Sequence, residues 1–252
     1  MSALAAAGRR ILPRGYLDFV GQVVIWLGFY FSYLGVRSLA GRNPSTAFLN
    51  GFRVIGWEQR LTHHLVEQTA QRIADSSQIL LTAAAWTYWN SEFTCIGLTL
   101  LWVYLRRYPQ FKRFRNAILL ANVVGLAGYI LMPTAPPWMF PAEGFVDGVN
   151  HQSGLIQSLA NPYAAMPSLH AGDALIVGVF MVASCRRWWT RTLWALWPLW
   201  VWFCVIATAN HFLLDVIAGI GVALLAMAIV SFAPKLIRRR AAPESAPIAN
   251  LL

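Results

Sequence analysis

Charged residues are scarce in this chain of 252 residues. They make up 12% of it, against about a quarter of an average soluble domain, while hydrophobic residues make up 58%. A soluble domain needs more charge than this, so the composition excludes that class and predicts an integral membrane protein. Twelve tryptophans agree with the prediction, because the indole ring settles at the boundary between lipid and water.

Cysteine is rare as well. Its three copies, Cys95, Cys185 and Cys204, lie in or beside apolar segments. Their number is odd and their spacing does not match that of a metal site. We therefore expect them to be small core residues.

Acidic residues are outnumbered by basic ones, which gives a net charge of +10. The basic residues gather at the ends of apolar segments, in RRYPQFKRFR (106–115), CRRWWTR (185–191) and KLIRRR (235–240). Such clusters orient membrane segments and attract anionic lipid headgroups. We therefore expect a membrane partner and no nucleic acid.

Six apolar segments approach the length of about 20 residues that crosses a membrane. They are residues 19–36, 87–105, 117–132, 171–184, 193–209 and 212–232. The first exceeds the usual core of a signal peptide, about 7–15 residues, so we expect an uncleaved anchor. The expected fold is an all-α membrane protein, a six-transmembrane helical bundle that forms a single domain over residues 1–252.

Residues 37–77, between the first two segments, are amphipathic. Apolar residues recur there at roughly helical spacing among polar ones: Phe48, Phe52, Ile55, Leu61, Leu65 and Ile73. This pattern predicts one or two interfacial helices at the membrane surface. His63 and His64 fall in this region, and we expect them on a solvated helix face.

The loop over residues 133–169 contains no lysine or arginine, whereas the loop after the second segment contains five. Under the positive-inside rule, this contrast makes residues 133–169 an extracytoplasmic loop. It also places the N-terminus (1–18) and the tail (235–252) in the cytoplasm. Five arginines in the first loop run against the rule: Arg37, Arg42, Arg53, Arg60 and Arg72. Three acidic residues in the same loop partly offset their charge.

This topology brings two histidines to one face of the membrane. His170 lies where the fourth segment starts, and His211 follows the fifth. Asp215 is four residues after His211, on the same helix face, and a carboxylate bonded to one imidazole nitrogen leaves the other as nucleophile or base. With His170 as general acid, these residues suit phosphoryl transfer through a phosphohistidine.

Other polar residues flank the histidines. Ser168 and the backbone amides that open the fourth segment suit an anion, and we count Pro167 and Asn210 with them as candidates for binding substrate. Asp173 has three possible roles: a bond to His170, a contact with an acceptor hydroxyl, or a place in the lining of a wet cavity. Glu92, a carboxylate within the second segment, is expected to face an interior cavity.

Two histidines and a carboxylate also suit a metal ion, with Asp173 or His151 as a further ligand. The phosphohistidine interpretation requires neither a metal nor an organic cofactor. We therefore expect no metal and no cofactor.

The motifs MPSLHAG (166–172) and ANHFLLDVIAG (209–219) resemble the second and third signatures of the type 2 phosphatidic acid phosphatase (PAP2) superfamily. YILMPTAPPWM (129–139) is similar to the branch that contains inositol phosphorylceramide synthases. The resemblance runs from about Gly51 to Gly221. It implies that His211 is the nucleophile, that Asp215 orients it, that His170 donates the proton, and that the membrane is the bacterial inner membrane.

The departures from the superfamily concern positive charge. Its first signature, Lys…Arg-Pro, is replaced by PTAPPWM, with Trp138 near the expected arginine, and Val205 stands where another arginine is expected. A phosphate monoester dianion would meet little compensating charge, which favours a phosphodiester, unless Arg53 or Arg60 folds over the site.

We therefore expect a lipid phosphotransferase or phosphatase that leans towards phosphodiester or headgroup transfer, with inositol-phosphate-like transfer as the type. Its partners are a phospholipid or other lipid phosphate and an acceptor alcohol or water. One alternative is a phosphatase of lipid or polyprenyl phosphate monoesters. The other is a non-enzymatic lipid transporter.

Overall fold

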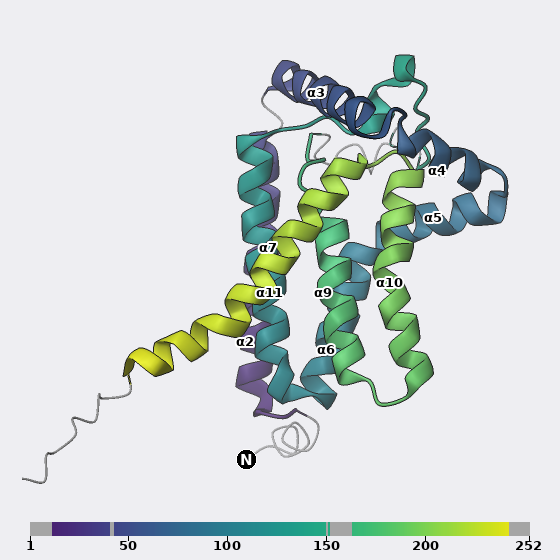
Figure 1. Cartoon of the computed structure of the whole chain (residues 1–252). Helices are drawn as coiled ribbons and strands as arrows, with labels where there is room; N and C mark the ends of the chain where they lie inside the picture. Colours follow the sequence, from purple (N-terminus) through teal and green to yellow (C-terminus); the bar gives the residue numbers. More distant parts are fainter. Residues whose placement is uncertain (1–11, 41–42, 150, 152–162, 242–252) are drawn as a thin grey trace, which may run out of the picture.

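The computed structural model describes residues 12–40, 43–149, 151 and 163–241, and Figure 1 shows a bundle of helices capped at one end. Within these residues there is no β-strand, and the predicted all-α class is confirmed. The helices are α2 (Gly15–Ala40), α3 (Pro44–Thr62), α4 (Val66–Asp75), α5 (Gln78–Asn90), α6 (Ile96–Arg106), α7 (Tyr108–Leu131), α9 (Leu169–Ser184), α10 (Trp188–Ala207) and α11 (Leu213–Ala241). Residues 1–11 and 242–252, which hold most of the predicted N-terminus and part of the predicted tail, lie outside the described residues, as do 150 and 152–162 of the predicted loop.

In the part of the chain that the structure describes, three helices are long and apolar enough to cross a membrane, namely Tyr108–Leu131, Trp188–Ala207 and Leu213–Phe232. The helix α9 is also apolar but has 16 residues. The number of six crossings therefore stays a prediction.

The predicted second crossing, residues 87–105, is not one continuous α-helix. It covers the end of α5, the π-helical turn η1 (Ser91–Cys95) and most of α6. A π-helical turn interrupts the regular hydrogen bonding of an α-helix and is frequent at functional sites. Here it carries Glu92.

The amphipathic region forms α3 and α4, which lie across the end of the bundle where α9 and α11 begin. The N-terminal end of α2 lies at the opposite end (Figure 1). Hydrogen bonds tie this helix pair to the loop that follows α7: Asn50 Nδ2 donates to the Pro133 carbonyl (2.9 Å), and Gln71 Nε2 donates to the Val146 carbonyl (2.7 Å). His63 and His64 are exposed, as predicted, but they lie in the turn between α3 and α4 rather than on a helix face, because α3 ends at Thr62.

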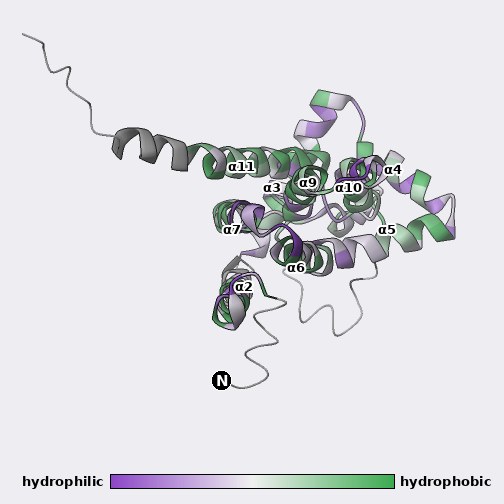
Figure 2. Cartoon of the chain, turned by 90° about the horizontal axis from the view of Figure 1, so that it is seen from below, coloured by the Kyte–Doolittle hydropathy of each residue, from purple (hydrophilic) through white to green (hydrophobic). Residues whose placement is uncertain are grey.

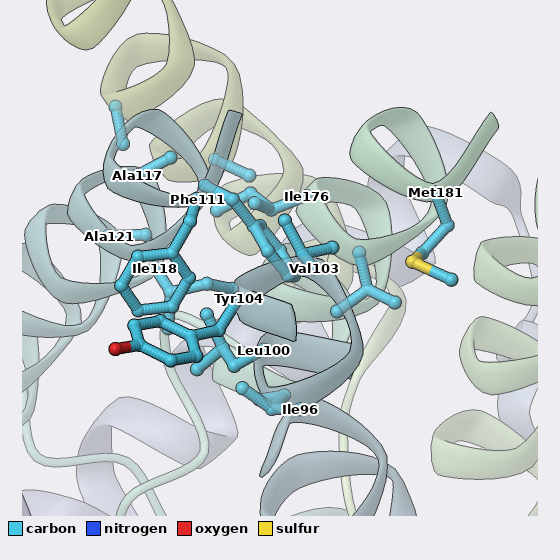
Figure 3. Close-up of a cluster of buried hydrophobic side chains, with 14 residues drawn as sticks. Ile96, Leu100, Val103, Tyr104, Phe111, Ala117, Ile118, Ala121, Ile176 and Met181 are labelled. Carbon is cyan, nitrogen blue, oxygen red and sulfur yellow. The ribbon is translucent and has the colours of Figure 1, made fainter. Parts of the chain in front are cut away.

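The apolar core lies between α6, α7, α9 and α11. Figure 3 shows Leu100 and Tyr104 of α6 beside Ile118 of α7. The Tyr104 hydroxyl donates to Asp18 (2.9 Å), which ties α6 to α2. Seen along the bundle axis, α9 and α11 are hydrophobic over much of their length (Figure 2). Large apolar side chains of α11 remain exposed, as expected for a helix that faces lipid, whereas most of α9 is buried.

Glycines bring α9 and α11 into backbone contact near the start of α9. A Cβ atom added at Gly172 would lie 2.8 Å from the carbonyl oxygen of Gly219, and one added at Gly219 would overlap the Ser168 carbonyl. Contacts this short are not tolerated by a methyl group, so both positions require glycine. The crossing of α9 and α11 fixes the relative positions of the segments that carry His170 and His211.

Candidate functional site

His211 lies in the tight connection between α10 and α11. The backbone N–H groups of Asn210 and His211 both donate to the Val205 carbonyl (3.1 Å), after Ala209, which has a left-handed conformation (φ 58°). The His211 ring is buried, and its Nδ1 atom lies 2.9 Å from the Ala165 carbonyl oxygen. Because a carbonyl oxygen only accepts hydrogen bonds, Nδ1 carries the hydrogen and Nε2 keeps its lone pair.

Asp215 lies near the same nitrogen but serves mainly as a helix cap. Its Oδ2 atom is 3.6 Å from His211 Nδ1, beyond hydrogen-bond distance. The same oxygen accepts the backbone N–H of Phe212 (2.8 Å). The first turn of a helix has unsatisfied N–H groups that attract a carboxylate, so the bond expected between Asp215 and the ring is made by Ala165 instead.

His170 is the second residue of α9, whose N-terminus is capped by Ser168: the Ser168 hydroxyl accepts the N–H of Ala171 (3.3 Å). The centroids of the His170 and His211 rings are 5.6 Å apart. His170 Nε2 lies 3.4 Å from a carboxylate oxygen of Glu92, and the Tyr88 ring stacks on His170 at 4.6 Å. The structure thus brings together the two histidines that sequence analysis singled out, with Glu92 beside them.

The comparison with protein families agrees with the motifs. The family model of the PAP2 superfamily matches residues 53–229. The chain belongs to the PAP2 superfamily. The family resemblance inferred from the two histidine motifs is therefore confirmed.

The relatives of this PAP2 protein include a membrane lipid enzyme. The chain is similar to the phosphoinositol dihydroceramide synthase of Bacteroides thetaiotaomicron, with 30% identity over 133 residues that cover 46% of this chain and 44% of that protein. It also resembles the crystal structure of LpxE from Aquifex aeolicus, with a TM-score of 0.50 and 16% identity over 65% of this chain and 92% of that one. The second likeness concerns the fold alone. The apolar helices of the chain, together with its similarity to the Bacteroides lipid enzyme, identify an integral membrane protein.

The other residues that sequence analysis placed at the PAP2 site bond to the protein itself. Both carboxylate oxygens of Asp173 accept from Asn122 Nδ2 (2.9 and 2.8 Å), not from His170. Asn210 Nδ2 donates to the Thr208 hydroxyl (2.8 Å), and Pro167 packs against Gly128 of α7. The Ser168 hydroxyl caps α9. Direct binding of substrate by any of these four side chains therefore stays a prediction.

A second pair of a histidine and an aspartate lies in the loop, and sequence analysis did not recognise it. His151 Nδ1 is 2.8 Å from Asp147 Oδ1, and the ring of Trp138 stacks on His151 at 4.4 Å. Burial alone would raise the pKa of Asp147, but hydrogen bonds from the ring and backbone of His151 lower it. The spacing of four residues between Asp147 and His151 was the available signal.

No arginine in the described residues supplies the site with positive charge that could offset a phosphate. Arg53 donates to Asn50 of its own helix (3.2 Å), Arg72 bonds to Gln68 and Thr69 of α4, and Arg60 is exposed. Among the described residues, every ion pair joins a histidine to a carboxylate. The structure therefore does not show Arg53 or Arg60 folded over the site, which was the alternative that would have favoured a monoester.

Metal binding was the alternative use of the histidines. Within the described part of the chain, no group of three His, Cys, Asp or Glu residues is placed to hold a metal ion.

Proposed function

We propose that this PAP2 protein transfers a phosphorylated headgroup from a lipid phosphodiester to an alcohol, through a phosphohistidine on His211. The observation that supports the proposal is the hydrogen bond between His211 Nδ1 and the Ala165 carbonyl (2.9 Å). It leaves the lone pair of Nε2 available for attack on phosphorus. The ring centroid of His170 lies 5.6 Å from that of His211, which is a suitable distance for His170 to protonate the departing oxygen.

The reaction has two displacements. In the first, His211 Nε2 bonds to phosphorus, the bond from phosphorus to the lipid oxygen breaks, and protonated His170 gives its proton to that oxygen. In the second, neutral His170 takes the proton of an acceptor hydroxyl, whose oxygen attacks phosphorus as the bond to Nε2 breaks. The Glu92 carboxylate, 3.4 Å from His170, stabilises the positive charge that His170 carries before the first displacement and again after the second.

The charges at the site favour a phosphodiester over a monoester. Glu92 adds negative charge beside His170, and no described lysine or arginine forms an ion pair there. A monoester dianion would be desolvated beside this carboxylate without compensation. We infer from the Bacteroides relative that the headgroup is inositol-phosphate-like and that the acceptor is a ceramide-like lipid hydroxyl.

We infer that the site opens at the extracytoplasmic face of a bacterial inner membrane, with both termini in the cytoplasm. The absence of lysine and arginine from residues 133–169 supports this orientation. So does the position of the site at the end of the bundle opposite to the start of α2 (Figure 1).

A transfer assay tests the proposal. Purified protein in detergent is incubated with phosphatidylinositol labelled at phosphorus and with dihydroceramide, and in parallel with labelled phosphatidic acid. We expect label on dihydroceramide and none with His211→Ala. Release of inorganic phosphate from phosphatidic acid alone would instead support a monoester phosphatase, and binding of unchanged lipid would support a transporter.

A further inference from the structure

Two buried carboxyl groups from the interfacial helices meet the start of α11. Glu58 lies on α3 and Glu67 on α4, and their side chains are 2% and 0% exposed. Carboxylates on amphipathic surface helices normally face water. Two that are fully buried on neighbouring helices therefore require a specific explanation.

Both carboxyl groups bind backbone N–H groups in the turn that follows His211. Glu67 Oε1 accepts from Leu213 (2.6 Å), and Glu58 Oε1 accepts from Leu214 (2.7 Å). Asp215 Oδ2 accepts from Phe212, directly before α11, so three consecutive N–H groups at the start of α11 are bound by three carboxyl groups. These bonds attach the pair of interfacial helices to the segment that carries His211.

The remaining oxygen of each carboxyl group bears on how many protons the pair holds. Among the described residues, Oε2 of Glu58 and Oε2 of Glu67 are both buried without a hydrogen-bond partner. No cation in the described residues lies within ion-pair distance of either one. The other titratable groups at this place are Asp215 and His211, and the arginines of α3 and α4 bond elsewhere or are exposed.

Two adjacent carboxylates cannot both remain ionised in such an environment. We propose that Glu58 and Glu67 share one proton between their Oε2 atoms, and that this acid pair positions His211 by holding the first turn of α11. The shared proton gives each free oxygen a partner, while each Oε1 atom stays bonded to the helix. Burial, followed by the neighbouring Glu67 carboxyl, raises the pKa of Glu58 from 4.5 to about 9, which agrees with a retained proton.

The role in positioning rests on the proposed function of His211 as nucleophile. The shared proton does not depend on it, so the two parts are tested by separate measurements.

The first measurement is the thermal midpoint in detergent, followed with a thiol-reactive dye that reports exposure of the free cysteines. Between about pH 4.5 and about pH 9 the folded protein keeps a proton on Glu58 that the unfolded chain releases. Stability from this group is therefore complete below pH 4.5 and is lost as the pH rises towards 9.

Glu58→Gln carries a permanent N–H donor and an oxygen for Leu214, so it mimics the protonated acid. We expect it to reduce the fall in the midpoint between pH 6 and pH 9 by at least about half. Asp75→Asn, which removes an exposed carboxylate at the end of α4, serves as the control and should keep the wild-type fall. A fall of equal size in Glu58→Gln would overturn the shared proton.

The second measurement is the pH profile of label transfer from phosphatidylinositol. Glu58→Ala breaks the bond to Leu214, and we expect kcat to drop about 10- to 100-fold with little change in KM. Glu58→Gln should restore kcat and extend it towards pH 9. If Glu58→Ala does not fold, the test is whether kcat of Glu58→Gln persists to higher pH than kcat of the wild type. The positioning role would be rejected if kcat of Glu58→Gln fell at the same alkaline pH as in the wild type. It would also be rejected if folded Glu58→Ala kept the wild-type kcat, whatever the thermal midpoints show.

Discussion

The Nδ1 atom of His211 lies 2.9 Å from the carbonyl oxygen of Ala165, 46 residues earlier in the chain. The backbone of the segment that leads into α9 therefore sets the tautomer of the histidine that precedes α11. The α9 and α11 segments are joined at the imidazole as well as at their glycine contact.

Replacing either histidine should abolish turnover and leave the bundle folded. His211→Ala removes the proposed nucleophile, and His170→Ala removes the proposed proton donor, a loss of about 10²- to 10⁴-fold for such a group. Label transfer measured beside the thermal midpoint checks this. Wild-type turnover by purified His211→Ala would exclude the phosphohistidine.

Asp215→Asn should cost much less activity than loss of the nucleophile. The tautomer of His211 is held by Ala165, and the amide oxygen of asparagine can still accept the N–H of Phe212. Asp215→Ala loses this cap as well, so its free energy of unfolding should fall by about 1 kcal/mol. Comparing kcat and thermal midpoint for the two variants separates charge from capping. Equal loss of activity in Asp215→Asn and His211→Ala would contradict this assignment.

Gly219→Ala should destabilise the protein and lower its activity, because the new methyl group would overlap the Ser168 carbonyl. Overpacking of this kind costs about 1–3 kcal/mol. Gly221→Ala is the matched control on α11, since an added Cβ atom there has nothing within 4 Å. A thermal midpoint of Gly219→Ala at or above that of the control would contradict the close contact.

Glu92→Gln should change the preference for substrates. Removing this negative charge 3.4 Å from His170 Nε2 withdraws support from protonated His170, so transfer from phosphatidylinositol should slow. Hydrolysis of phosphatidic acid should rise relative to that transfer, because a dianion then meets less repulsion. Parallel assays with the two labelled lipids give this ratio, and an unchanged ratio would remove Glu92 from the account of specificity.

Sequence analysis placed the two histidines at one end of the bundle because that result depends only on hydrophobic segments and basic loops. It did not foresee the carbonyl of Ala165, since a backbone oxygen has no signature in side-chain pattern. Asp173 bonds to Asn122 of α7 rather than to His170. Helical spacing shows which residues share a face, but not which residue of another helix faces them.

The same limit explains the interruption of the second crossing and the burial of Glu58. Residues 87–105 have the hydropathy of one segment, but the chain forms a π-helical turn at Ser91–Cys95. Glu58 occupies an amphipathic helix, where hydropathy predicts exposure, yet it is buried because the start of α11 supplies an N–H group to it.

The glycine contact between α9 and α11 also bears on how substrate choice can change. Main-chain atoms, rather than adjustable side chains, meet where α9 crosses α11, so the spacing of these two helices tolerates little variation. New headgroups or acceptors would then be accommodated at the periphery, in the surrounding loop and the interfacial helices. Diversification of such a scaffold would proceed by remodelling its outer parts around a fixed helix crossing.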